Sequence, residues 1–65
     1  MKNQNYLSRD ELVAGLVIEH QRLGRGVIES LVLADDSSED MIRIQFDEID
    51  GSRELLIEKV KLKAV

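Results

Sequence analysis

His20 is the one histidine of this chain and the side chain best suited to proton transfer near neutral pH. General acid–base catalysis also needs a reacting partner within hydrogen-bond reach and a pocket. The chain has no cysteine, and none of its serines lies in a motif typical of a nucleophile. We therefore interpret His20 as a structural residue that ends a strand, hydrogen-bonds the backbone of the next turn and has no catalytic role. The chain is predicted not to be an enzyme.

Two other segments have the composition of a phosphate or metal site but not its spacing. Gly24-Arg25-Gly26 is glycine-rich, yet it lacks the lysine and the Ser or Thr that complete a nucleotide-binding loop, so we interpret it as a turn. The acidic run 35–40 lacks the spacing and the glycine of a calcium loop, and we interpret it as a solvated connection. We expect no metal, no cofactor and no small-molecule substrate.

Aromatic side chains make up 3% of the chain, as Tyr6 and Phe46. Methyl-lysine cages, grooves for proline-rich peptides and platforms for single-stranded nucleic acid all use exposed aromatic rings. Phe46 shares its strand face with Ile42 and Ile44, so we assign it to the core. The composition argues against these three functions, and an interface would use backbone edges, aliphatic groups and charges.

The charges are unevenly distributed along a chain of net charge −4. Residues 1–28 sum to +1, residues 29–50 to −7 and residues 51–65 to +2. Binding to duplex DNA draws much of its affinity from cations that neutralise phosphates. The negative net charge therefore favours a protein partner, although a local basic face could still contact nucleic acid.

Two groups of cations are candidates for binding. The group predicted to contact a protein partner comprises the arginines near expected turns: Arg22, Arg25 and Arg53. As the alternative, we keep a contact with nucleic acid. It would use the alternating lysines near the C-terminal end: Lys59, Lys61 and Lys63. Ordinary solvated arginines remain an equally good interpretation of the first group.

Short strands must position these residues. Apolar alternation predicts strands at 16–20, 27–34, 41–47 and 52–57, followed by a short lysine-bearing edge strand at 59–64. Turn glycines are expected at three positions: Gly24, Gly26 and Gly51. With 65 residues, 43% of them hydrophobic, and no cysteine for a disulfide, the chain is expected to form one small all-β domain. We predict a closed or nearly closed five-stranded barrel with a thin aliphatic core.

The N-terminal part is expected to contain a short helical turn. Residues 1–7 are predicted to be a flexible N-terminus and residues 8–65 to be the domain. Ser8 and Glu11 have the spacing of a capping box, and Gly15 suits the end of a helical turn within 8–14. No stretch is apolar enough to span a membrane or to be a secretory signal, so we expect no membrane contact and a cytoplasmic location.

Two blocks of the sequence resemble the small C-terminal domain of UvrD/PcrA-type DNA helicases. The first block follows the pattern G-x-x-V-x-H-x-x-F-G-x-G-x-V, with the order Gly15, Ile18, His20, Leu23, Gly24, Gly26 and Ile28. The second block contains Ile44-Gln45-Phe46-Asp47, then Gly51, Arg53, Leu55 and Leu62. Leu23 replaces the usual phenylalanine, Arg53 replaces the usual lysine, and the turn between Phe46 and Gly51 is one residue longer. The resemblance covers about residues 15–62.

The resemblance implies an SH3-like or tudor-like barrel with a role in protein contact, notably with RNA polymerase, and in nucleic-acid contact. The first block also resembles, more distantly, the RNA polymerase-interacting domain of CarD-type transcription factors. Any ATPase or helicase activity would reside in other domains of a parent protein. Three hypotheses stay open: a module that docks on RNA polymerase or another DNA-transaction protein, a DNA-binding module, and a domain that only packs on the rest of a longer chain.

Overall fold

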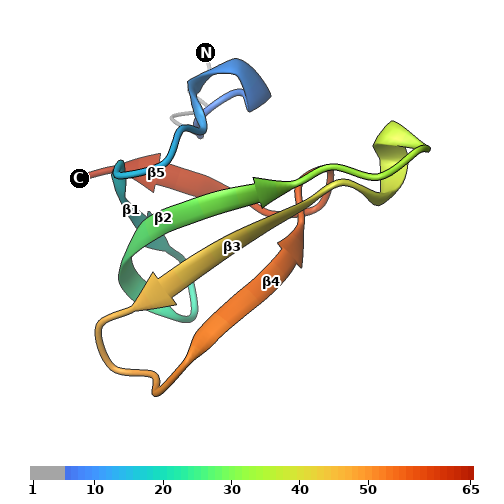
Figure 1. Cartoon of the computed structure of the whole chain (residues 1–65). Helices are drawn as coiled ribbons and strands as arrows, with labels where there is room; N and C mark the ends of the chain where they lie inside the picture. The colour runs from blue at the N-terminus through green and yellow to red at the C-terminus, as the bar shows by residue number, and fades with distance from the viewer. Residues whose placement is uncertain (1–5) are drawn as a thin grey trace, which may run out of the picture.

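The computed structural model describes residues 6–65, which form one antiparallel sheet of five strands (Figure 1). The strands are β1 (Val17–His20), β2 (Gly24–Val32), β3 (Met41–Phe46), β4 (Ser52–Leu56) and β5 (Leu62–Ala64). Two short 3-10 turns, η1 (Arg9–Glu11) and η2 (Ser37–Glu39), precede β1 and β3. The predicted five-stranded, mostly β fold with a short N-terminal helical turn is confirmed. No helix in the described residues has the length and apolar character needed to cross a membrane.

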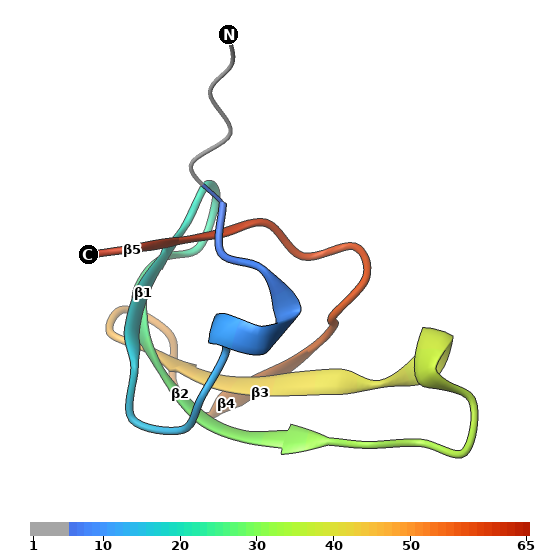
Figure 2. The same cartoon turned by 90° about the horizontal axis from the view of Figure 1, so that it is seen from above.

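The strand order in the sheet is β4-β3-β2-β1-β5, so β4 and β5 are its two ends. The sheet curls strongly, and η1 lies across its open side between β5 and β3 (Figure 2). Within residues 6–65 no ladder joins β4 to β5, so the sheet is curled without being closed by hydrogen bonds. The closed barrel stays a prediction.

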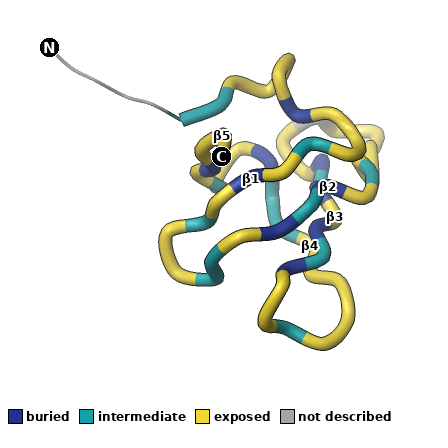
Figure 3. Tube along the Cα trace, turned by 90° about the vertical axis from the view of Figure 1, so that its left-hand side faces the viewer, coloured by how far each residue is buried: buried dark blue, intermediate teal, exposed yellow. Residues whose placement is uncertain are grey.

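The core consists of aliphatic side chains that point into the curl. Along β3, Ile42, Ile44 and Phe46 are 0% exposed and alternate with more exposed neighbours, as the apolar pattern predicted (Figure 3). The other buried hydrophobic residues come from most of the remaining chain: Leu12, Ile18, Ile28, Ile57 and Leu62. Because the core is small, each of these side chains carries a large share of the stability.

A β-bulge in β2 shifts its register against β3. The β2–β3 ladder pairs Ile28 with Ile44 and then Ser30 with Arg43, so Glu29 is the extra residue. Beyond the bulge β2 leaves the core, since Leu31 and Val32 are exposed.

The turn glycines have two different roles. Gly24 and Gly51 have φ values of 88° and 83°, a left-handed conformation that suits glycine at the ends of the two hairpin connections. The prediction that Gly26 is a turn residue is wrong, because Gly26 lies inside β2 and has no positive φ. A Cβ atom there would lie 2.8 Å from the Phe46 ring and 2.9 Å from the Gln45 carbonyl oxygen. Gly26 is needed for close packing against β3.

Asp40 departs from the prediction that the whole acidic run is solvated. It is 3% exposed, whereas Asp35, Asp36, Ser38 and Glu39 are exposed. Its carboxylate accepts hydrogen bonds from the Ala34 N–H at 2.6 Å and from the Arg9 guanidinium, and its carbonyl accepts from the Ile57 N–H at 3.0 Å. Asp40 therefore joins η1, the β2–β3 connection and the end of β4.

The N-terminal segment has a capping contact of its own and a backbone hydrogen bond to the sheet. The Glu11 carboxylate accepts the Ser8 backbone N–H at 2.8 Å, which is the half of the predicted capping box that fixes η1. The Leu7 N–H donates to the Leu62 carbonyl at 2.7 Å, so Leu7 joins the folded domain. The predicted flexible N-terminus otherwise falls mainly on residues 1–5, which lie outside the described residues.

Candidate functional site

His20 ends β1, and its ring is held by the following turn. Its Nδ1 accepts the backbone N–H groups of Arg22 at 3.0 Å and Leu23 at 3.1 Å. The ring also packs edge-on against Phe46, with 5.9 Å between ring centroids and an interplanar angle of 85°. The structural role predicted for His20 is confirmed. Since Nδ1 acts as an acceptor, the proton of the neutral ring resides on Nε2, which is its remaining donor.

The electrostatic environment favours the neutral form of this ring. Partial burial and the nearby positive charge of Arg22 both lower the pKa of His20 below its usual value. A neutral imidazole keeps Nδ1 available for the two turn N–H groups. The local positive potential thus supports the conformation of the turn.

Cations from two distant parts of the chain meet around His20. One surface hollow of about 160 Å³ beside the ring is lined by Gln21, Arg22, Lys59 and Lys61. A second hollow of about 250 Å³ on another side of the ring is lined by Tyr6, Glu19, Gln21, Lys61 and Lys63. β5 places the lysines here because it pairs with β1, with Leu62 opposite His20. We call Arg22, Lys59, Lys61 and Lys63 the basic cluster.

Tyr6 supports part of the basic cluster. The ammonium groups of Lys61 and Lys63 lie 5.7 and 5.6 Å from the centroid of its ring. Cation–π attraction at this distance offsets some of the repulsion between the two lysines. The position of Tyr6 beside these lysines is not predictable from the sequence, because no motif or periodicity relates residues more than fifty positions apart.

The structure does not bring the three predicted arginines together. Arg22 belongs to the basic cluster, whereas Arg25 lies opposite Glu19, which in turn lies opposite Lys63 on the other side of β1. Arg53 lies on β4, at the other end of the strand order. Two of the lysines assigned to the alternative function, Lys59 and Lys61, line a hollow with Arg22, whereas Arg25 and Arg53 do not line it.

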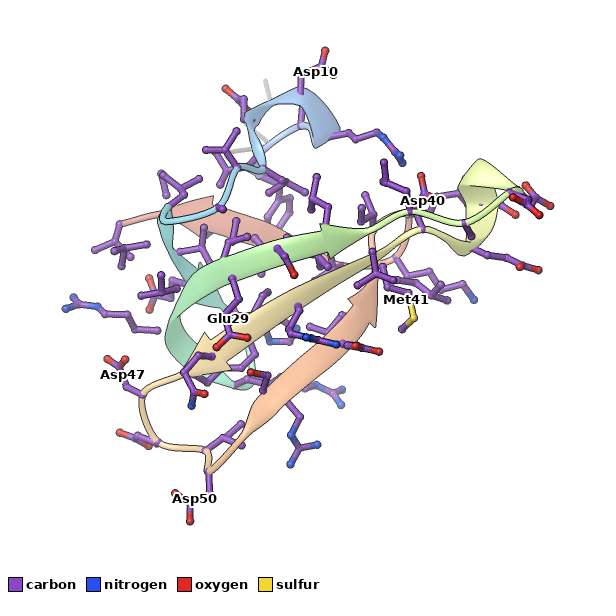
Figure 4. All side chains as sticks on the ribbon, viewed as in Figure 1. Asp10, Glu29, Asp40, Met41, Asp47 and Asp50 are labelled. Carbon is purple, nitrogen blue, oxygen red and sulfur yellow. The ribbon has the colours of Figure 1, made fainter. Side chains whose placement is uncertain are left out.

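The charges of the basic cluster are not neutralised by ion pairs. In residues 6–65 the salt bridges join Arg9 to Asp40 and Arg43 to Glu54, and neither includes a member of the cluster. Several carboxylates lie on other parts of the molecule: Asp47 and Asp50 project from the β3–β4 connection, and Glu29 lies on β2 (Figure 4). The basic cluster thus gathers four cations on an acidic chain, with Glu19 as the carboxylate that lines one of its hollows.

The described residues contain no group of three His, Cys, Asp or Glu side chains arranged to hold a metal ion. Comparisons with protein-family models, curated proteins and solved structures found no significant match for the chain. The assignment of function consequently rests on the geometry of the basic cluster and on the sequence resemblance.

Proposed function

We propose that this chain is a non-enzymatic interaction module whose basic cluster docks on an acidic surface of RNA polymerase or another DNA-transaction protein. The observation that carries the proposal is the convergence of Arg22 with three lysines on a chain of net charge −4. Like charges held together oppose folding, and an acidic partner would relieve that repulsion. Charge complementarity of this kind supplies specificity and fast association.

The proposal includes the fold and the setting. We propose that the curled sheet is an SH3-like, tudor-like barrel and that the module acts in the cytoplasm without a cofactor. The resemblance to the C-terminal domain of UvrD/PcrA-type helicases, and more distantly to CarD-type domains, supports this assignment. Gly24, Gly26 and His20 have structural roles here, so the shared pattern accounts for the hairpin and leaves the choice of partner to the charged surface.

A free strand edge supplies a second contact region. Among the described residues β4 pairs with β3 alone, so its other edge can accept a strand from a partner. Arg53 lies on this strand and is exposed, as is Arg25 on β2. We retain both arginines as secondary contacts that fix the orientation of a bound protein.

The test is an NMR titration of the ¹⁵N-labelled domain with core RNA polymerase fragments. We expect amide shifts at residues 20–23 and 59–63, and their loss in the double variant Arg22→Glu/Lys61→Glu. The charge-matched control Arg25→Glu/Arg53→Glu retains most of the binding. Binding that survives the first variant and disappears in the second would move the docking surface away from the basic cluster.

A DNA-binding module is the second candidate, and the position of the lysines favours it. Lys59 and Lys61 line one hollow with Arg22, and Lys63 lines the neighbouring one with Lys61, so up to four phosphates could be neutralised along the two hollows. Each phosphate contact adds about 0.9 to the slope of log K against log salt, which gives a slope of roughly −3.6 for four contacts. A short duplex titrated in parallel would favour this candidate if it produced that slope while the polymerase fragments produced no shifts.

A further inference from the structure

We propose that the hollow beside His20 on the Arg22 side is a binding site for one phosphate group, with Arg22, Lys59, Lys61 and the His20 Nε2–H as its donors. This inference goes beyond the proposed function. It concerns one oxyanion site that can be tested without any partner protein.

The two hollows beside His20 differ in charge. The hollow proposed as the site contains Arg22, Lys59 and Lys61 and no carboxylate among its lining residues. The neighbouring hollow contains Glu19 together with Lys63, and these two residues face each other across the β1–β5 ladder. Three cations without a counter-ion suit a dianion, whereas the neighbouring hollow already holds its own carboxylate.

His20 adds a neutral donor whose tautomer is set by the turn. Both N–H groups that Nδ1 accepts are backbone groups, so the proton on Nε2 does not depend on a flexible side chain. Those same two N–H groups are occupied by His20 and cannot bind the ligand themselves. The site therefore binds through side chains, with the Gln21 carboxamide as a further lining group.

The lining of the hollow indicates the group that it suits. Three cationic side chains and the His20 ring surround an open depression in the surface, which suits an anionic group carried on another molecule. Because the net charge of −4 disfavours a nucleic acid as the carrier, we commit to a phosphate on the surface of a protein partner.

The first experiment titrates the labelled full chain with sodium phosphate at pH 7, against sodium chloride at matched ionic strength. We expect a saturable shift of the His20 ring nitrogens and of the amides of residues 20–23 with phosphate only. Acetate should bind at least tenfold more weakly, because a monoanion satisfies fewer of the donors. Shifts that match those in chloride, or equal affinity for acetate, would overturn the site.

Variants localise the site within the basic cluster. The double variant Arg22→Ala/Lys61→Ala should weaken phosphate binding at least tenfold, and Lys63→Ala, on the side of Glu19, should weaken it less than twofold. Equal losses in both would show diffuse attraction and would overturn the proposal. All three side chains are exposed, so the variants should fold. Circular dichroism spectra that match the wild type would confirm this.

A bound dianion also leaves a signature in the titration of His20. The charged groups around the ring are Arg22, Lys59 and Lys61 on one side and Glu19, Lys61 and Lys63 with Tyr6 on the other, while Phe46, Leu55 and Val60 are the apolar neighbours. Phosphate should raise the pKa of His20, since a negative charge favours the imidazolium. An unchanged pKa at saturating phosphate would place the anion away from the ring and overturn the site.

Two further arms identify the source of the phosphate. One compares an acidic peptide containing phosphoserine with its unphosphorylated form, and the other compares a 5′-phosphorylated oligonucleotide with its unphosphorylated form. A gain with the phosphopeptide supports the site and its protein carrier. A gain with the oligonucleotide alone would overturn the assignment to a protein carrier, and no gain in either arm would overturn the site. If phosphate fails to bind while polymerase fragments still shift residues 20–23, the phosphate site falls and the docking proposal stands.

Discussion

Arg9 with Asp40 and the basic cluster are two charged regions built on opposite physical principles. Asp40 is buried, accepts a hydrogen bond from Ala34 and is paired with Arg9, so its charge serves the fold. The cluster around His20 is exposed, and its cations have no ion pair among the described residues. Removing one partner of a buried, paired charge destabilises a structure, whereas gathered like charges favour binding an ion or partner of opposite sign.

Removing the Asp40 carboxylate should have the largest effect on stability of the changes in these two regions. Asp40→Ala leaves the Ala34 N–H and the Arg9 guanidinium without their partner and detaches η1 from the sheet. We expect the thermal midpoint, followed by circular dichroism, to fall by roughly 10 °C in a domain of this size. Asp35→Ala, at an exposed position of the same acidic run, is the control and should shift it by less than about 3 °C. Equal shifts would mean that Asp40 has no special role.

Gly26→Ala tests the close packing of β2 against β3, on which the position of His20 and the basic cluster depends. The added methyl group would lie 2.8 Å from the Phe46 ring, against which His20 also packs. We expect a loss of about 1–3 kcal/mol in the free energy of unfolding in urea, as for other overpacked cores. Phosphate affinity measured on the remaining folded protein should fall with it, because the turn that carries Arg22 moves. A variant as stable as the wild type would show that β2 and β3 can separate at little cost.

The two regions should respond to acid in different pH ranges. Hydrogen bonds from Ala34 and Arg9 lower the pKa of Asp40, so its contribution is present above the unfolded pKa near 4 and is lost as the pH falls further. Burial and Arg22 lower the pKa of His20, so stability also declines as the pH falls from about 6.5, because the unfolded chain binds the proton more readily.

Urea unfolding between pH 3 and 8 measures both contributions. His20→Gln should remove the decline that begins near pH 6.5 and leave the one near pH 4. Asp40→Asn should remove the decline near pH 4 and leave the one that begins near pH 6.5. A single decline that neither variant changes would show that other groups determine the acid response.

The smallest expected effect concerns the cations themselves. Lys59→Ala removes one exposed like charge beside Arg22 and Lys61, so the free energy of unfolding should rise by up to about 0.5 kcal/mol at low salt and match the wild type at about 1 M salt. Arg43→Ala is the contrasting control, because it breaks the exposed pair with Glu54 and should lower stability slightly. A loss of stability in the lysine variant would mean that repulsion within the basic cluster does not oppose folding.

Much of the fold follows from short-range patterns. The alternation of Ile42, Ile44 and Phe46 predicts β3 and its inner face correctly. Successive side chains of a strand point to opposite faces, so a strand with one buried face has apolar residues at every second position. The role of His20 also followed from local sequence, since its hydrogen-bond partners are two and three residues away. The apolar pattern does not mark the bulge at Glu29, because Leu31 beyond it is exposed.

The sequence by itself determined the strands, the turns at Gly24 and Gly51, and the structural role of His20, because each depends on residues within a few positions of one another. Only the tertiary structure decided which charges act together. Pairing of β5 with β1 joins the lysines to Arg22, and packing of η1 buries Asp40 beside Arg9. Both results depend on contacts between segments more than thirty residues apart, which neither composition nor periodicity specifies.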